Sequence, residues 1–449
     1  MRHGPTPSLV RTLWVALALI ASVSSSFAQD RAELVRRDLE SFLEHGLWIY
    51  NDLDKGFEEA RKTGKPLAVV LRCIPCEACR GFDEQVAELH PRIRSLLDKF
   101  VRVRIPQANG LDLSIFQFDY DLSFYAFFFH PDGSIYGRFG SRSTQEDKSG
   151  ETSVAAFEET LRAVLELHER YAEVRDSLRS KKGPKPDYPV PEKIPPLEGR
   201  YGAELDYEGK VVQSCIHCHQ IRDSERQMVR DARKAIPDTV LFPYPSPSVV
   251  GLELDPKKRA TVVEVSARSP AEKAGFHAGD EIMTLEEQPI ISVADIEWIL
   301  HHAKDGETLE ATVRRDGEDK ERSVSLRLPE GWRARSDISW RVSTWDLRRM
   351  GTGGLRLEEL TDAERKEHGI APGKLALRAK HVGQYGEHAT AKRAGFEQGD
   401  IIVAIDGSDE RRTESELIAY TVQKKRPGDR LELEVLRRKE RRTFAFDLR

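Results

Sequence analysis

The hydrophobic residues in the first third of the chain follow two patterns, one typical of β-strands and one typical of helices. Short apolar runs, some continuous and some alternating with polar residues, have the length of β-strands. These runs lie at residues 67–71, 100–105, 124–129 and 135–139. Apolar residues at the three- and four-residue spacing of helices surround them, over residues 31–62, 82–97 and 153–179. We therefore predict an α/β domain over residues 29–180.

Two proline-rich stretches interrupt this patterning. Six prolines lie among lysines and acids in residues 181–198, which predicts a semi-extended linker. A second rigid stretch covers residues 242–247. Between them, residues 199–248 form a short segment with helices predicted over 203–212 and 221–234.

The last third of the chain contains an internal repeat. Residues 269–282 and 389–402 share the pattern Ala-Gly-Phe-x-x-Gly-Asp-x-Ile. Glycines at the shared turns suit left-handed backbone angles. The repeat predicts two domains, at residues 249–335 and 336–449, and the second copy carries an insertion that includes residues 369–373.

The five cysteines form two local clusters, Cys73, Cys76 and Cys79, and then Cys215 and Cys218. Local clusters are typical of redox or cofactor sites rather than of a disulfide framework. The first cluster directly follows the apolar run at 67–71 and precedes a helix. This order resembles the thioredoxin fold over residues 45–178. The resemblance implies that Cys76 is an exposed nucleophile at a helix N-terminus and that Cys79 is the buried resolving thiol.

Two features depart from the thioredoxin pattern. Cys73 creates a second, overlapping Cys73-x-x-Cys76 pair, so a thiol relay and a structural bond between Cys73 and Cys76 are both open. The family's cis-proline would fall near Phe124 or Tyr125, where the sequence has no proline. Activity in thiol chemistry and an idle, structural disulfide are therefore alternative roles for this cluster.

The second cluster reads Cys215-Ile216-His217-Cys218-His219 and matches the attachment signature of c-type haem. The resemblance implies thioether links from Cys215 and Cys218 to haem c, with His219 as a ligand of the haem iron. The segment is short for a cytochrome, and no second axial ligand is evident. A thiol pair or a disulfide between the two cysteines is an alternative. Zinc is disfavoured, because ligands packed into five residues rarely form a tetrahedron.

Both repeat copies resemble the PDZ domains of exported bacterial proteases, over residues 249–328 and 352–449. The resemblance implies that a loop binds the C-terminal carboxylate of a partner peptide, which then adds a strand to the sheet edge. The loop residues would be Gly251, Leu252, Glu253 and Leu254 in the first copy and Gly354, Leu355, Arg356 and Leu357 in the second. The groove helices are predicted over residues 293–302 and 414–423. For either copy, the alternative is a structural module with a closed groove.

The N-terminal pattern and the overall composition predict where the protein is located and which functions are disfavoured. Residues 1–28 combine basic residues, a short apolar core and a small-residue end, as a secretory signal does; an uncleaved anchor is the alternative. No later segment is apolar enough to cross a membrane. The formal net charge is −5 with no basic face, which disfavours nucleic acid as a partner. No nucleophile turn or Ser/His/Asp set suggests a protease.

The combination predicts a multidomain protein: an α/β thioredoxin-like domain, a small helical haem-type segment and two α+β PDZ domains. It resembles thioredoxin/PDZ proteins of planctomycete-type bacteria. The leading prediction is an exported redox protein, periplasmic or secreted, that exchanges thiols or haem electrons and recruits partner proteins through their C-termini. The alternative is a non-enzymatic adaptor in which the thioredoxin-like domain is a scaffold.

Overall fold

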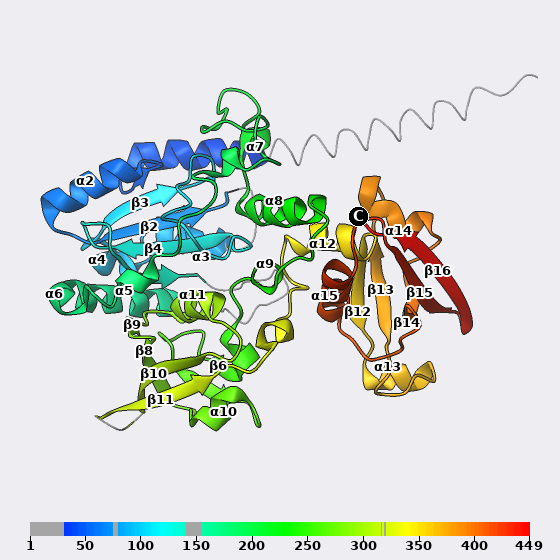
Figure 1. The fold of residues 1–449 in the computed structure, drawn as a ribbon. Helices are drawn as coiled ribbons and strands as arrows, with labels where there is room; N and C mark the ends of the chain where they lie inside the picture. Colours follow the sequence, from blue (N-terminus) through cyan, green and yellow to red (C-terminus); the bar gives the residue numbers. More distant parts are fainter. Residues whose placement is uncertain (1–30, 75–79, 141–153, 316, 318–319) are drawn as a thin grey trace, which may run out of the picture.

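The computed structural model describes residues 31–74, 80–140, 154–315, 317 and 320–449. The predicted signal segment, Cys76 and Cys79 lie outside these ranges. We call residues 29–180 the N-terminal domain, 199–248 the central segment, 249–335 the first repeat domain and 336–449 the second repeat domain. Figure 1 shows the first repeat domain below the N-terminal domain, with helices of the central segment leading across to the second repeat domain.

The N-terminal domain is built on a five-stranded mixed sheet. The strand order is β1-β3-β2-β4-β5, with β2 parallel to β3 and antiparallel to β4. The strands are β1 (Ile49–Tyr50), β2 (Leu67–Arg72), β3 (Val101–Ile105), β4 (Phe124–Phe129) and β5 (Ile135–Phe139). Every residue of β2 is buried, because hydrophobic clusters cover both faces of the sheet. The four predicted strands and the hairpin of β4 with β5 are confirmed.

Helices complete this domain. They are residues 31–45, α2 (Leu53–Thr63), α3 (Arg80–Ala87), α4 (Pro91–Leu97), α5 (Val154–Glu169) and α6 (Tyr171–Val174). The helices α3, α4 and α5 pack on one face of the sheet, against Ala68 and Val70 of β2. The prediction of one helix over residues 153–179 is wrong in extent, because Arg170 leaves the helical conformation (φ −105°, ψ 23°) and separates α5 from α6.

The proline-rich linker packs against the N-terminal domain. It contains the 3₁₀ turns η1 (Arg179–Lys181) and η2 (Pro191–Lys193). Lys181 is fully buried, and Ile194 and Leu197 join the hydrophobic cluster on the second face of the sheet. These contacts fix where the following segment lies.

The central segment carries three short elements and one longer helix. They are α7 (Val211–Ser214), α8 (Cys218–Asp231), α9 (Asp238–Leu241) and η3 (Pro247–Val250). The predicted helix over 203–212 is wrong. The Asp206 carboxylate accepts hydrogen bonds from the backbone N–H groups of Gly209 and Lys210, at 2.9 Å each, and this turn competes with a helix. The helix predicted over 221–234 corresponds to α8.

The first repeat domain combines a four-stranded sheet, in the order β11-β10-β8-β9, with the two-stranded sheet β6-β7. The strands are β6 (Leu252–Leu254), β7 (Val262–Val265), β8 (Asp280–Leu285), β9 (Gln288–Pro289), β10 (Thr308–Arg315) and β11 (Glu321–Arg327). The helices are α10 (Pro270–Ala274), α11 (Val293–His302) and η4 (Trp332–Arg335). The helix α11 confirms the prediction over 293–302.

The second repeat domain has a single five-stranded sheet, β12-β13-β14-β15-β16. Its strands are β12 (Leu355–Glu359), β13 (Leu377–Val382), β14 (Ile401–Ile405), β15 (Arg430–Arg437) and β16 (Glu440–Asp447). Its helices are α12 (Thr344–Gly351), α13 (Asp362–Glu367), η5 (Gly386–Ala389), α14 (Thr390–Arg393) and α15 (Glu414–Lys424). The predicted helix over 414–423 matches α15, and α13 lies in the region of the insertion.

The aspartate shared by the two repeats has the same role in both domains. Asp280 accepts a hydrogen bond from Arg315 Nε at 2.7 Å, and Asp400 accepts one from Arg437 Nε at 2.6 Å. Both carboxylates are almost fully buried, so each needs its arginine. The repeat in the sequence therefore reflects a repeated fold.

The helix α11 attaches the first repeat domain to the N-terminal domain. Asp295 lies 3.0 Å from Lys181 Nζ, and both side chains are fully buried. Asp295 also accepts a hydrogen bond from the backbone N–H of Arg138 in β5. The Arg138 guanidinium lies 3.7 Å from the centroid of the Trp298 ring. This interface places one side of the first repeat domain against β5.

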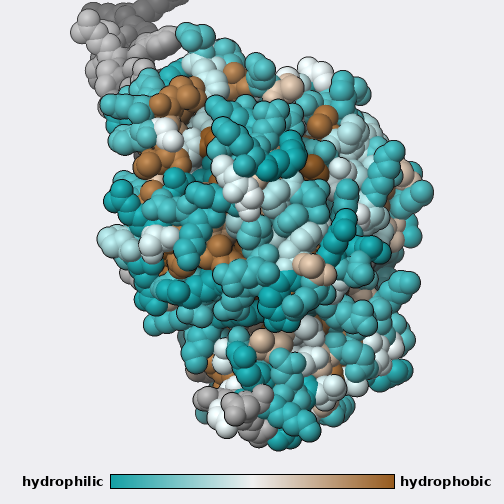
Figure 2. Space-filling model, turned by 90° about the vertical axis from the view of Figure 1, so that its left-hand side faces the viewer, coloured by the Kyte–Doolittle hydropathy of each residue, from teal (hydrophilic) through white to brown (hydrophobic). Residues whose placement is uncertain are grey.

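The surface is mostly hydrophilic. Figure 2 shows that hydrophilic residues dominate the face formed by the N-terminal and first repeat domains, with apolar residues in small patches. In the part of the chain that the structure describes, no helix has the length and hydropathy needed to cross a bilayer.

Candidate functional site

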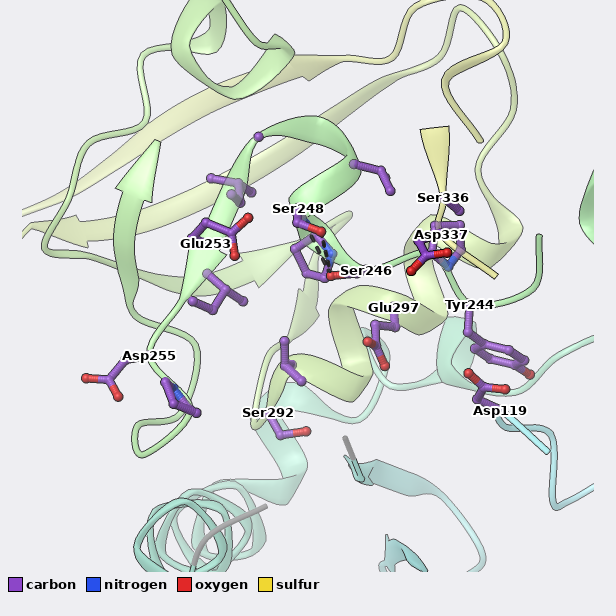
Figure 3. Close-up of a pocket in the computed structure, with 18 of the residues that line it drawn as sticks. Asp119, Tyr244, Ser246, Ser248, Glu253, Asp255, Ser292, Glu297, Ser336 and Asp337 are labelled. Atoms are coloured by element: carbon purple, nitrogen blue, oxygen red, sulfur yellow. Dashed lines mark hydrogen bonds between the residues drawn. The ribbon is translucent and has the colours of Figure 1, made fainter. Parts of the chain in front are cut away.

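A cavity of about 490 Å³ lies at the interface of the N-terminal and first repeat domains. The four predicted loop residues Gly251, Leu252, Glu253 and Leu254 form one side of it, and Val293 and Glu297 of α11 form another. The N-terminal domain contributes Leu122, Phe139 and Thr160, and residues 335–337 and 340–341 close a further side. Figure 3 shows Glu253 and Glu297 on facing elements, with Ser336 and Asp337 at the side of the cavity.

The loop conformation requires a glycine at position 251. Ser246 precedes the turn η3, and its side chain accepts a hydrogen bond from the Ser248 N–H; Gly251 follows the turn with φ +91°. A Cβ at this position would overlap the Ser269 side chain. The chain then enters β6, where Leu252 is buried and Glu253 is exposed. The edge of β6 therefore faces α11 across the cavity, as expected for a peptide groove.

One buried arginine of the cavity wall is neutralised by carboxylates. Arg341 donates to Asp119 at 2.6 and 2.7 Å and to Asp121 at 3.2 Å. Asp121 in turn accepts a hydrogen bond from the backbone N–H of Ser343. This network joins the N-terminal domain to the segment that leads into α12.

The corresponding region of the second repeat domain is filled by the chain itself. Gly354 again precedes a strand with φ +90°, and Leu355 and Leu357 are buried in β12. The helix α12 packs against α15 and β12, and its Arg348 shares the Glu414 carboxylate with the backbone N–H of Leu357 in the strand that carries Gly354, Leu355, Arg356 and Leu357. Peptide binding by these four residues stays a prediction.

The described part of the first cysteine cluster is Cys73. It is disulfide-bonded. Its backbone N–H donates to the Ser123 carbonyl at 3.1 Å, directly before β4. No described residue near β4 follows a cis peptide bond. The catalytic roles of Cys73, Cys76 and Cys79 stay predictions.

The fold brings the two cysteine clusters together. Cys73 Sγ lies 3.3 Å from Nδ1 of His217, although 144 positions separate them. Asn109 holds the second cluster in place: its Oδ1 accepts from the Ile216 N–H at 2.7 Å, and its Nδ2 donates to the Ser214 carbonyl at 2.9 Å. Sequence patterns did not identify Asn109, because nothing local marks a side chain that binds a segment a hundred residues away.

The second cluster is largely buried. Cys215 and Cys218 are free thiols, and burial raises the pKa of each to about 12. Burial also lowers the pKa of His217 to about 4, so the imidazole beside Cys73 is neutral at neutral pH. His219 Nδ1 lies 3.0 Å from Asp223 Oδ2 on the next turn of α8. In this arrangement the two thiols are protonated and poorly nucleophilic.

This arrangement does not fit a covalently bound haem. Cys215 is enclosed by apolar side chains, and Cys218 packs on the N-terminal domain, so protein atoms occupy the space around both sulfurs. The side chains around Cys215 are Val35, Ile74, Leu205 and Val211. Among the residues that the structure describes, no group of three His, Cys, Asp or Glu side chains is arranged to hold a metal ion. Haem attachment at Cys215, Cys218 and His219 stays a prediction.

Comparison with known proteins identifies the classes of domain. Residues 48–131 match the thioredoxin-like family, and residues 247–326 and 382–448 match the PDZ domain family. The protein therefore combines a thioredoxin-like domain with two PDZ domains. The N-terminal domain is the thioredoxin-like one, and the two repeat domains are the first and second PDZ domains.

Similarity to individual proteins is confined to part of the chain. A probable periplasmic serine endoprotease, DegP-like, of Pseudomonas savastanoi pv. phaseolicola (strain 1448A / Race 6) is 30% identical over 154 residues, which are 34% of this chain and 30% of that protein. Its counterpart in Ectopseudomonas mendocina (strain ymp) is 30% identical over 155 residues, 34% of this chain and 31% of that protein. The crystal structure of the serine endoprotease from Yersinia pestis is 25% identical, covers 18% of this chain and 28% of its own, and has a TM-score of 0.16. The chain thus spans about 30% of the length of these curated relatives.

Proposed function

We propose that this protein is an exported thiol–disulfide protein that recruits partners by binding their C-terminal peptides in the first PDZ domain. One observation carries the proposal: the cavity along Gly251–Leu254 is bordered by the thioredoxin-like domain. A partner held in this groove would contact both domains at once. Its tethering would raise the effective concentration of its thiols near the redox site.

The structure links the groove to the cysteine cluster through one short segment. Leu122 lines the cavity, and the next residue, Ser123, accepts the backbone hydrogen bond of Cys73. A peptide in the groove would therefore lie against the segment that supports Cys73. This proximity favours a shared function over two independent modules.

The proposed chemistry is thiol–disulfide exchange at the first cluster. A partner thiolate attacks one sulfur of the protein's disulfide and forms a mixed disulfide. A second partner thiol resolves it, so the partner gains a disulfide, and the protein's two released thiolates take up the two protons. The reverse sequence oxidises the protein. Cys73 is one half of the disulfide in this structure, and the roles of nucleophile and resolving thiol fall to Cys76 and Cys79 by resemblance. The protonated thiols of Cys215 and Cys218 do not take part.

Two observations support export of the protein. The pattern of residues 1–28 is that of a secretory signal. The similar endoproteases carry names that describe them as periplasmic. Disulfides persist in such compartments, which suits the disulfide-bonded state of Cys73.

Two measurements test this proposal. Decapeptides with a free C-terminal carboxylate should bind the full chain, and their amidated forms should bind at least tenfold more weakly, because a PDZ loop recognises the carboxylate. Exchange of the pre-reduced protein with oxidised glutathione should be lost in Cys76→Ser and retained in the matched variant Cys215→Ser. Equal binding of both peptide forms, or unchanged exchange in Cys76→Ser, would contradict it.

A further inference from the structure

The helix α12 lies across the space between β12 and α15 of the second PDZ domain. At one end, the Trp345 ring packs edge-on against His381 of β13, with ring centroids 5.6 Å apart. At the other, Leu347 and Met350 share a buried cluster with Ile418 and Val422 of α15. The end of α12 approaches α15 so closely that a Cβ at Gly351 would overlap the Thr421 hydroxyl. The helix therefore contacts both the sheet and the helix that border this groove.

Polar contacts close the strand edge beneath α12. The backbone N–H of Leu357 donates to Glu414 Oε1 at 2.6 Å. Arg348 of α12 donates to the same carboxylate at 3.0 and 2.6 Å, and both side chains are buried. A peptide that adds a strand needs such outward N–H groups on β12 as hydrogen-bond donors. Here a side chain of the same domain already takes one.

From these contacts we infer that α12 is an internal ligand of the second PDZ groove. It buries the apolar face of α15 that a peptide side chain would otherwise cover, and it holds Glu414 on the strand edge. The second PDZ domain thus uses its groove to attach itself to the rest of the chain. It binds no peptide while α12 is in place.

The central segment holds α12 in this position. Arg226 of α8 is fully buried and donates to the Ser343 hydroxyl at 2.7 Å, at the start of α12. Ile236, Leu241 and Phe242 add to the cluster around Leu347 and Met350. Arg230 donates to the carbonyl of Arg449 at 2.8 Å. The groove, α12 and the central segment therefore form one packed unit.

Hydrogen–deuterium exchange on the full chain tests the inference. In Leu347→Asp, a carboxylate replaces a buried apolar side chain of α12, so α12 should detach and exchange in residues 355–359 should rise at least tenfold. Exchange in β15 and β16 should stay unchanged, which shows that the domain remains folded. The matched control Val342→Ala, at a side chain that is 49% exposed just before α12, should leave residues 355–359 protected. If Leu347→Asp unfolds the domain, the milder Leu347→Ala replaces it.

The same exchange experiment with added peptides separates this inference from the proposed function. A pool of decapeptides with free carboxylates should slow exchange at residues 355–359 only in the Leu347→Asp chain. Slower exchange at 355–359 in the unmodified chain, or unchanged exchange there in a folded Leu347→Asp chain, would overturn the inference. Failure of the pool to protect residues 251–254 would instead count against the proposed function alone.

Discussion

The two PDZ domains share a repeat but differ in what covers their grooves. In both, a glycine with a positive φ precedes the groove strand, at Gly251 and at Gly354. In the first domain the groove faces a cavity bordered by the thioredoxin-like domain. In the second it lies beneath α12. The same fold therefore places one groove at a cavity and the other beneath a helix.

The groove helices of the two PDZ domains differ in residue type at two positions, in line with this difference in what covers the grooves. The first helical residue is Val293 in α11 and Glu414 in α15. The fifth is Glu297 in α11, which lines the cavity, and Ile418 in α15, which contacts α12. A polar fifth residue suits an open groove, and an apolar one suits a covered groove. The sequence around a repeated motif thus decides which copy stays open.

The largest loss of stability is expected from a substitution that breaks the attachment of the first PDZ domain to the thioredoxin-like domain. Asp295→Ala removes the partner of the buried Lys181, and an uncompensated buried charge costs about 3–5 kcal/mol of stability. Because burial lowers the pKa of Lys181 to about 8, the loss should be smaller at pH 9 than at pH 7. Denaturant unfolding measures both values. The control Asp176→Ala removes an exposed pair, and an equal loss there would contradict the account.

The next largest loss of stability is expected from a substitution that loosens α12 over the second groove. Leu347→Ala should cost about 2–5 kcal/mol, because it leaves a cavity between α12 and α15. Leu43→Ala, at a side chain that is 68% exposed, is the matched control and should change little. Thermal unfolding compares the two variants. A loss below about 1 kcal/mol in Leu347→Ala, which is the size of a surface effect, would contradict close packing of α12 on α15.

A third change gives the first groove a feature of the second. Val293→Glu places a carboxylate where Glu414 stands in α15, so it can accept from the β6 backbone and compete with a peptide strand. The affinity for a free-carboxylate decapeptide should fall about tenfold, or about 1.4 kcal/mol. Fluorescence anisotropy measures it. Val263→Glu, on the exposed side of β7, should retain full affinity; equal affinities of both variants would refute the assignment of the groove.

The smallest effect concerns the central segment, which holds α12. Burial raises the pKa of the Cys215 thiol to about 12, from 9.0 in an exposed thiol. The folded state therefore keeps a proton that the unfolded state loses, and stability is full below pH 9 and falls above it. The loss at pH 10 should be about 1 kcal/mol. Cys215→Ala should flatten this decline, and an equally steep decline in that variant would assign it to other groups.

The sequence predicted what local patterns encode. The continuous apolar run at 67–71 corresponds to the buried strand β2, and the helical pattern at 293–302 to α11. The glycine before each groove strand was also predictable, because its φ is a local requirement. Local patterns gave no sign that Lys181 would be buried in what reads as a polar linker, since its partner Asp295 lies in another domain.

The arrangement of the candidate sites depended on long-range contacts. The approach of His217 to Cys73 and the role of Asn109 follow from how the central segment packs, which no spacing reveals. The covering of the second groove had a weak local signal: Leu347 and Met350 lie three positions apart, as on one face of a helix. That signal could have identified α12 but not the groove that it occupies.

The stoichiometry of peptide binding tests the central claim most directly. Isothermal titration of the unmodified full chain with a decapeptide selected from a free-carboxylate library should give one site per chain, lost in Gly251→Val, whose side chain would overlap Ser269. Two sites per chain, or one site that survives Gly251→Val in a folded protein, would contradict an open first groove and a covered second one.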